Sequence, residues 1–256
     1  MLKIRKQQMT VFEETAWRRF EDEMVLHSQQ FTPRLCVVLG EERLRVALRQ
    51  AMQRASEYGF TNRGPMRLYI ELMFLCGSDF DTDPQYPELG KILAAEGEQM
   101  QRAEQIHLGI EDYLQNVSGR DAANVHKALQ ALAEFARKPV IFSEANFETE
   151  IMQEMHRAFP QKTAYVGKAG LAKLIQEARA EARKYAFPAH RGDALLVILK
   201  FAFGHGCTND PLYPWMSQTL QDKKIVDPAA RARRLENKAL TWLDHVLARP
   251  PKGAEV

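Results

Sequence analysis

The chain has 256 residues, of which 45% are hydrophobic and 27% charged, and this composition excludes a disordered, collagen-like or mainly membrane-embedded protein. Up to Lys127 there are 16 basic and 19 acidic residues, and after it 19 and 14, so the net charge changes from −3 to +5. This positive excess is too small for a typical nucleic-acid-binding domain, and we predict no nucleic-acid partner.

The first half of the chain reads as a series of helices. In residues 41–59, EERLRVALRQAMQRASEYG, apolar residues recur three and four positions apart, and Gly59 stands where a C-terminal cap belongs. Residues 66–77, MRLYIELMFLCG, are apolar on nearly all sides, which predicts a helix in the middle of its bundle. Residues 99–117 predict a further helix. Only RLCVVLG, at 34–40, resembles a strand.

The later segments repeat this order after one linking helix, predicted over residues 121–138. Residues 168–186 have the same helical spacing as the first periodic segment, and residues 193–204, DALLVILKFAFG, are again apolar nearly all round. A closing helix is predicted over residues 228–247, where Asp227 is suited to be the N-cap. The two halves therefore have the same sequence of elements.

An offset of 127 residues aligns the halves without a gap. Identical pairs include Pro33/Pro160, Gly40/Gly167, Tyr58/Tyr185, Phe60/Phe187, Gly77/Gly204, Asp83/Asp210, Pro84/Pro211, Tyr86/Tyr213 and Pro87/Pro214. We interpret the chain as two copies of one module. The prediction is an all-α protein of two tandem, similar helical bundles, with repeat 1 at 1–127, the end of the linking helix and a junction at 128–142, and repeat 2 at 143–256.

Three aspartates at alternate positions, Asp79, Asp81 and Asp83, suggest a cation site in the segment GSDFDTDPQYP. An EF-hand loop requires glycine at its sixth position and glutamate at its twelfth, where this segment has Pro84 and Gly90. The second copy, GHGCTNDPLYP, keeps only the last aspartate. We therefore predict a turn in both copies, the alternative being a weak cation or a partner contact in the first.

A nucleophile is conceivable in the second copy, where His205, Cys207 and Asp210 lie close in sequence. Working triads are assembled in space from separate segments, so this proximity is weak support. The histidines do not have the spacing of a metal motif. We predict no enzyme, no catalytic residue, no cofactor and no metal site, and keep a hydrolase or transferase using the Cys207 loop as an alternative.

The expected compartment is the cytoplasm. The three cysteines have no paired spacing, which argues against a disulfide framework. No apolar run follows the basic residues at the start, so no secretory signal is predicted. The longest apolar run, at 194–203, contains Lys200 and is about half the ~20 residues of a membrane helix. We expect no membrane association.

The order of features resembles helical accessory proteins encoded beside spike-tip and toxin genes in bacterial type VI secretion clusters. The matching features are Lys3-Ile4-Arg5 with Gln8-Met9, then Phe12 and Phe20, RASEYGF, LYIELMF and GSDFDTDPQYP. The resemblance covers residues 1–93 and part of 143–247, where DPAARARRLENKAL is similar to the family's closing helix. The second copy departs from it by lacking the acidic series.

The resemblance implies a non-enzymatic binding protein. The leading hypothesis is an adaptor or co-chaperone that holds a toxin effector or its loading factor before export, and the alternative is an immunity protein that neutralises a cognate toxin. Either requires a surface that buries about 800 Å² per partner. We expect the protein partner at the seam between the copies or on the loops at 78–87 and 205–214, through aromatic, arginine and acidic residues. The predicted partner-binding residues are Arg67, Asp79, Asp81, Tyr86, Tyr213 and Trp215.

Overall fold

The computed structural model describes residues 6–138 and 142–248. Helices joined by turns make up these residues, which contain no β-strand, so the prediction of an all-α protein is confirmed. No helix within the described residues has the length and apolar character needed to cross a membrane. The predicted stop of the linking helix at Pro139, and with it part of the junction at 128–142, lies outside the described residues.

The first half, as we use the term below, comprises the helices from α1 to α6. They are α1 (Lys6–Phe31), α2 (Pro33–Leu39), α3 (Glu41–Glu57), α4 (Arg63–Cys76), α5 (Pro87–Ala94) and α6 (Gln99–Tyr113). The periodic segment forms α3 as predicted, with its apolar face buried and Gly59 in a left-handed conformation after its end. The apolar segment forms α4, which packs on α1, α3 and α6.

The strand prediction for residues 34–40 was wrong, because these residues form α2. Pro33 occupies the first turn, where its missing N–H costs nothing, and Gly40 ends the helix with φ 73°. A short apolar run has no periodicity long enough to separate a strand from two helical turns. In the helix Cys36 and Leu39 face the core.

The second half comprises the helices from α8 to α12. They are α8 (Phe147–Ala158), α9 (Pro160–Lys184), α10 (Arg191–Phe203), the 3₁₀ turn η3 (Cys207–Asn209), α11 (Pro214–Leu220) and α12 (Pro228–Leu247). Asp227 caps α12 as predicted, since its carboxylate accepts hydrogen bonds from the N–H groups of Ala229 and Ala230. Helix α9 is interrupted at Gly167, where φ is 70°.

Backbone angles agree closely at several positions 127 residues apart. Gly40 has φ 73° and ψ 158°, and Gly167 has φ 70° and ψ 167°. Tyr86, before α5, has φ −132° and ψ 51°, and Tyr213, before α11, has φ −125° and ψ 56°. The chain thus turns in the same way at matching points of the two halves.

A linking region connects the halves through a π-helical turn, η1 (Leu114–Ser118), a 3₁₀ turn, η2 (Arg120–Ala122), and helix α7 (Ala123–Arg137). Helix α7 begins a few residues before the predicted boundary at 127. It packs mainly on α12, and also on α8 and η1. The linking helix therefore completes the second bundle.

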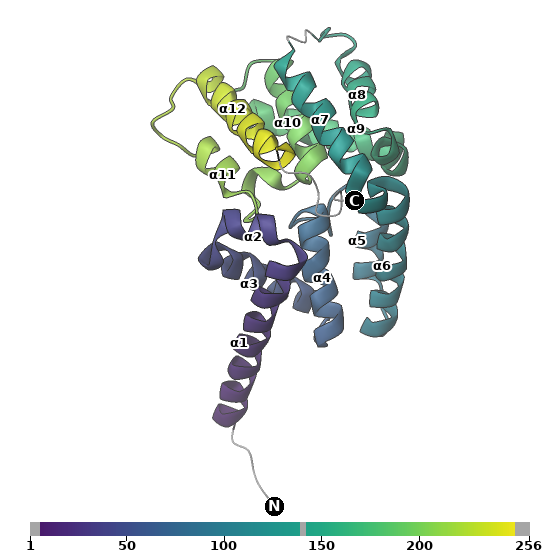
Figure 1. The fold of residues 1–256 in the computed structure, drawn as a ribbon, viewed down its shortest axis with the longest axis vertical. Helices are drawn as coiled ribbons and strands as arrows, with labels where there is room; N and C mark the ends of the chain where they lie inside the picture. The colour runs from purple at the N-terminus through teal and green to yellow at the C-terminus, as the bar shows by residue number, and fades with distance from the viewer. Residues whose placement is uncertain (1–5, 139–141, 249–256) are drawn as a thin grey trace, which may run out of the picture.

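Helix α1 is the most prominent projection of the molecule (Figure 1). Its C-terminal part packs on α2, α3 and α4, and burial begins at Phe20 and Glu21. The preceding turns extend away from the body as an arm of about 20 Å, at 1.5 Å per residue. Phe12 is 67% exposed there and Trp17 42%. We call residues 6–19 the α1 arm.

Candidate functional site

The two aspartate-containing loops meet face to face between the halves. We call residues 77–86 the first joint loop and residues 204–213 the second. The Asp83 carboxylate accepts a hydrogen bond from the N–H of His205 at 2.7 Å, and the Asp210 carboxylate accepts one from the N–H of Ser78 at 2.9 Å. Each loop therefore closes the other through the aspartate that both copies share.

Each of these carboxylates also holds its own loop. Asp83 accepts from the N–H of Gln85 at 2.8 Å, and Asp210 accepts from the N–H of Leu212 at 2.8 Å. Both aspartates are only 2% exposed. Aspartates that bond to the backbone two residues on are typical of turns, so the turn prediction is confirmed for both loops.

Two glycines bring the loops into contact. Gly77 and Gly204 have φ of 96° and 98°, a conformation that side chains rarely adopt. A Cβ on Gly77 would lie 2.7 Å from the Phe203 carbonyl oxygen, and a Cβ on Gly204 would lie 2.8 Å from that of Cys76. Only glycine fits both positions, and the joint brings backbone against backbone.

An ionic cluster ties the first joint loop to α3. The Arg54 guanidinium contacts Asp79 and binds both oxygens of Asp81, at 2.6 and 2.7 Å. The Asp81 carboxylate also accepts hydrogen bonds from the hydroxyls of Tyr58 at 2.9 Å and Tyr69 at 3.1 Å. Burial, together with the bond to Asp81, raises the pKa of Tyr58 to about 12. The aspartates that suggested a cation site are held by an arginine.

A second ionic cluster ties the second half together at the matching place. Lys200 on α10 forms a salt bridge with Glu181 on α9 at 2.7 Å and also donates to the His205 carbonyl. The Thr208 hydroxyl donates to Glu181 at 2.6 Å. Glu181 lies 127 residues after Arg54. The helix carries the cation in the first half and the anion in the second.

A single lysine is buried between the halves. Lys162 is 5% exposed and donates to the Phe201 carbonyl at 2.5 Å. Its ammonium lies 4.9 Å from the centre of the Phe201 ring and 5.7 Å from that of Tyr86. Burial lowers the pKa of Lys162 to about 8, although Asp83 and Cys76 act in the opposite direction. The charge is stabilised mainly by aromatic faces and one carbonyl.

Cys207 does not have the surroundings of a nucleophile. Its side chain is fully buried, and burial raises the pKa of the thiol. A thiolate is therefore disfavoured, whereas reactive cysteines are partly exposed and have lowered pKa values. The His205 ring is engaged elsewhere, with Nδ1 3.2 Å from Glu177 and Nε2 3.1 Å from the Thr82 hydroxyl. These contacts do not support the alternative of thiol chemistry.

Metal-binding side chains do not gather in the described part of the chain: no group of three or more His, Cys, Asp or Glu residues there could hold a metal ion. Asp79 and Asp81 point at a guanidinium, which occupies the place that a cation would take. The joint between the halves is therefore a structural centre built from charge pairs and backbone caps.

The structure places most of the predicted partner-binding residues inside or beside this joint. Tyr86 is 2% exposed and its ring packs on Tyr113, with 5.6 Å between ring centres. Tyr213 and Trp215 are half-buried beside Phe203. Their contact with a partner stays a prediction, which requires the joint loops to offer what little of these side chains is accessible.

Arg67 lies apart from the joint loops. It is on α4, where its guanidinium binds Glu71 at 2.9 Å, and Glu71 also contacts His27 at 2.8 Å. Arg67 is the most accessible of the predicted partner-binding residues for which an exposed fraction is known, with 53% of its side chain exposed. The structure thus brings Asp79 and Asp81 together on Arg54, and does not bring Arg67 to them.

Sequence reasoning missed the charged residues that build the joint, namely Arg54, Lys162, Glu181 and Lys200. A signal was present in the alignment of the halves. Arg54 is matched with Glu181 and Asp81 with Thr208, while Met73 is matched with Lys200. Opposite charges at matching positions, with a cation inside an apolar run, are typical of buried ion pairs that have changed together.

A groove lies between the α1 arm and α3. It has a volume of about 800 Å³ and is lined by Glu14, Trp17, Arg18, Glu21, Asp22, Arg45, Arg49, Met52 and Gln53. The carboxylate of Glu21 accepts hydrogen bonds from Arg49, at 2.9 Å from two nitrogens, and from Arg45 at 3.1 Å. The bonds from Arg49 are the main reason that the pKa of Glu21 is lowered. The groove thus combines an exposed indole with fixed charges of both signs.

Comparison with known proteins gives no relative: no protein-family model matches the chain, and no curated protein or solved structure shows significant similarity to it.

Proposed function

We propose that the protein is a non-enzymatic binding protein that holds a protein effector of a type VI secretion cluster, as an adaptor or co-chaperone, through the α1 arm and the groove beside it. The resemblance to accessory proteins of these clusters supports the proposal, since it is strongest over residues 1–93. The same residues build the arm and the groove.

The projecting arm is the observation that carries the proposal. An isolated helix of fewer than about 12 residues is marginal in water, and most helical stability comes from packing of an apolar face. The arm has Phe12 and Trp17 exposed without such packing in the described structure. Tryptophan beside arginines, here Arg18 and Arg49, is the composition of binding hot spots. A partner surface laid along the arm supplies the missing packing.

We further propose that the two halves arose from one duplicated module, and that the arm is specific to the first. The close backbone angles at matching positions and the exchanged caps of Asp83 and Asp210 support the duplication. In the second half the matching helix, α8, begins at Phe147, the counterpart of Phe20. The second half thus lacks an arm on this helix, so the first provides the partner-binding element.

The test is quantitative co-purification of the tagged full chain from its native host. The variant carries Phe12→Ser and Trp17→Ser, and its matched control carries Leu108→Ser and Val226→Ser, which also remove exposed apolar side chains, 61% and 83% exposed. Loss of two hot-spot side chains costs 2 kcal/mol or more, so we expect the captured partner to fall at least about tenfold with the arm variant alone.

Equal capture by the arm variant and the control contradicts the proposal, provided that circular dichroism shows both variants folded. The adaptor and immunity roles are then separated with the identified partner. An immunity protein protects cells that produce the toxin without a secretion apparatus, whereas an adaptor is required for export and leaves such cells unprotected.

A further inference from the structure

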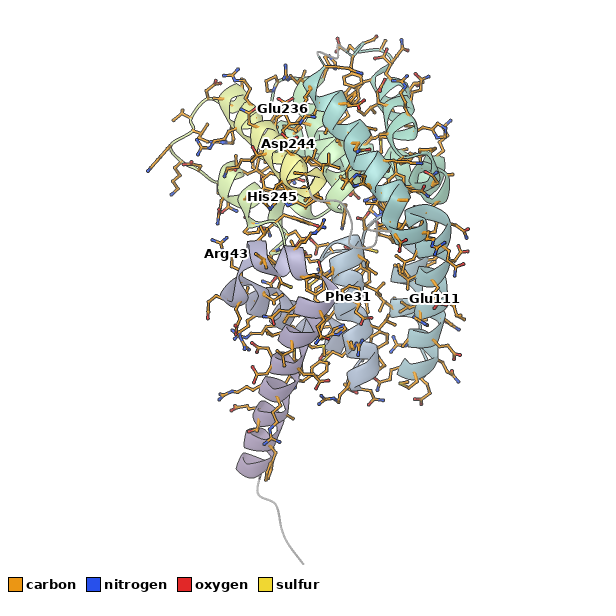
Figure 2. The ribbon with its side chains drawn as sticks, viewed as in Figure 1. Phe31, Arg43, Glu111, Glu236, Asp244 and His245 are labelled. Atoms are coloured by element: carbon orange, nitrogen blue, oxygen red, sulfur yellow. The ribbon has the colours of Figure 1, made fainter. Side chains whose placement is uncertain are left out.

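A small apolar pocket opens in the second half between α7, α10 and α12, with a volume of about 90 Å³. Large apolar side chains form its interior, and they are Leu132, Phe135, Phe142, Leu195, Ile198 and Leu243. Helix α12 forms one wall, on which Glu236 and Asp244 are about two turns apart (Figure 2). Asp244 pairs with Arg137 at the end of α7 and fixes α7 against α12.

The pocket exists because one face of α10 is not covered. Helix α10 is apolar on nearly all sides, and a helix of this kind is expected to be packed all round. Leu195, Ile198 and Ala202, which follow each other by three and four positions, are nevertheless only half-buried and line the pocket. Apolar surface is thus presented to a cavity of about the size of a single ring, since cavities of ~150 Å³ hold benzene.

Positive charge surrounds the mouth of the pocket. Lys138 and Arg191 both line it, and Glu236 is the one acidic residue among its lining residues in the described structure. Glu236 is bound by Arg191, at 3.0 Å, so its charge is neutralised. Lys138 forms no salt bridge within the described residues. An anionic group at the mouth is therefore favoured over a cationic one.

We propose that this pocket binds a free small apolar carboxylate, with one ring or short branched chain between α10 and α12 and its carboxylate beside Lys138 and Arg191. An apolar cavity with a few polar groups at its edge is the usual form of a small-molecule site between helices. The inference goes beyond the proposed function, because it concerns the other half and does not depend on the α1 arm.

The first half has no such pocket at the matching place. The counterparts of Leu195, Ile198 and Ala202 on α4 are Leu68, Glu71 and Leu75. Glu71 is bound by Arg67 and His27, so a salt-bridged carboxylate replaces an apolar wall. This face of α4 is an internal control for the face of α10.

The experiment titrates the full ¹⁵N-labelled chain with 3-phenylpropionate and, separately, with 3-phenylpropylamine, a molecule of similar size and opposite charge. We expect 3-phenylpropionate to shift amide signals of α7, α10 and α12 with a dissociation constant in the millimolar range, which suits about −0.3 kcal/mol per atom. The amine should bind at least about fivefold more weakly, because the charges at the mouth repel it.

Two variants locate the site. Ala202→Leu narrows the pocket and should abolish binding, and Lys138→Glu should weaken binding of the acid at least about fivefold while improving that of the amine. Arg67→Glu makes a charge reversal on α4 and is the matched control, which should bind like the unaltered chain. Thermal unfolding establishes that each variant is folded, and Ile198→Phe replaces Ala202→Leu if that variant does not fold.

The proposal is overturned if acid and amine bind equally, if the shifted signals map outside the pocket, or if Lys138→Glu leaves acid binding unchanged. It is also overturned if the acid binds only to a chain lacking residues 249–256, since the occupant is then the chain's own terminus. The arm variant Phe12→Ser with Trp17→Ser should bind the acid normally. Failure here therefore leaves the proposed function untouched, and the reverse also holds.

Discussion

The two halves stabilise the same place in the fold with opposite charges. In the first half Arg54 on α3 holds Asp81 of the joint loop, and in the second Glu181 on α9 holds Lys200 of α10. The buried member is Asp81 in one, with 1% of its side chain exposed, and Lys200 in the other, with 5%. What both halves require is a closed polar network between helix and loop, whichever sign the helix carries.

Away from this place the halves differ in what they expose. The first half has the α1 arm and a charged groove, whereas the second has an apolar pocket closed by α7. The joint is alike in both halves down to the glycines and aspartates that build it. The comparison teaches that the shared positions stabilise the fold, and that the binding surfaces are to be found where the halves disagree.

Breaking one ion pair should have the largest effect. Arg54→Met leaves Asp81 buried without a cation, which costs about 3–5 kcal/mol. Glu181→Leu leaves Lys200 uncompensated and should cost a similar amount. Equilibrium unfolding in urea measures both free energies of unfolding. A loss below 1 kcal/mol in either variant means that this pair does not stabilise its half.

Moving the second network into the first half sharpens the same comparison. The triple variant Arg54→Glu, Met73→Lys and Asp81→Thr gives the first half the residues of Glu181, Lys200 and Thr208. We expect it to be more stable than Arg54→Glu alone, because the new lysine compensates the glutamate. If the triple variant is as unstable as the single one, the two places are not equivalent.

Removing the crossed caps should come next. Asp83→Ala leaves two buried N–H groups without acceptors, those of His205 and Gln85, at about 1–3 kcal/mol each. Asp210→Ala does the same to Ser78 and Leu212. We expect about 3 kcal/mol for each variant, equal within about 1 kcal/mol, in urea unfolding. A clearly unequal pair of losses contradicts the similarity of the two joint loops.

Buried Lys162 should give a pH dependence that its counterpart Leu35 cannot give. Its folded pKa of about 8 lies below the unfolded value of about 10.4, so the unfolded chain binds more protons between these values. Stability therefore rises with pH, by about 1.5 kcal/mol from pH 8 to 9.5. The difference in unfolding free energy between the unaltered chain and Lys162→Met isolates the effect. A constant difference over this range refutes it.

The smallest expected effect concerns the ends of α3 and α9. Gly59 has φ 75°, and its counterpart Ala186 has φ 51°, a left-handed conformation that strains alanine. Gly59→Ala should destabilise the protein and Ala186→Gly should stabilise it, each by about 0.5–1 kcal/mol, measured by thermal unfolding. Stabilisation by Gly59→Ala would show that the backbone differs from this description.

The helices and turns could be predicted from the sequence because their causes are local. The spacing of Leu44, Ala47 and Leu48 predicts the buried face of α3, and Asp227 predicts the start of α12, as observed. The short run around Val37 and Val38 was misread, since both side chains are exposed on a helix, 82% and 54%, where an apolar run suggests burial. Two helical turns give too few residues for a period to be read.

The joint could not be predicted in the same way because its contacts cross the molecule. Asp83 was predicted to accept backbone N–H bonds, but its bond to His205 joins residues 122 positions apart. Arg54 and Lys162 looked like ordinary exposed charges on helices, and only the packed structure shows what they hold. The predicted contacts of Arg67, Tyr213 and Trp215 with a partner stay predictions.

The exchange of caps between Asp83 and Asp210 has a consequence for a shorter chain. A polypeptide with the first half alone would leave the N–H of Ser78 without its acceptor and Asp83 without its donor from His205. Such a chain could satisfy both groups only by meeting a twin, with each subunit lending its aspartate to the other in an isologous contact. The present molecule builds that two-fold arrangement within one polypeptide, which leaves each subunit-like part free to specialise.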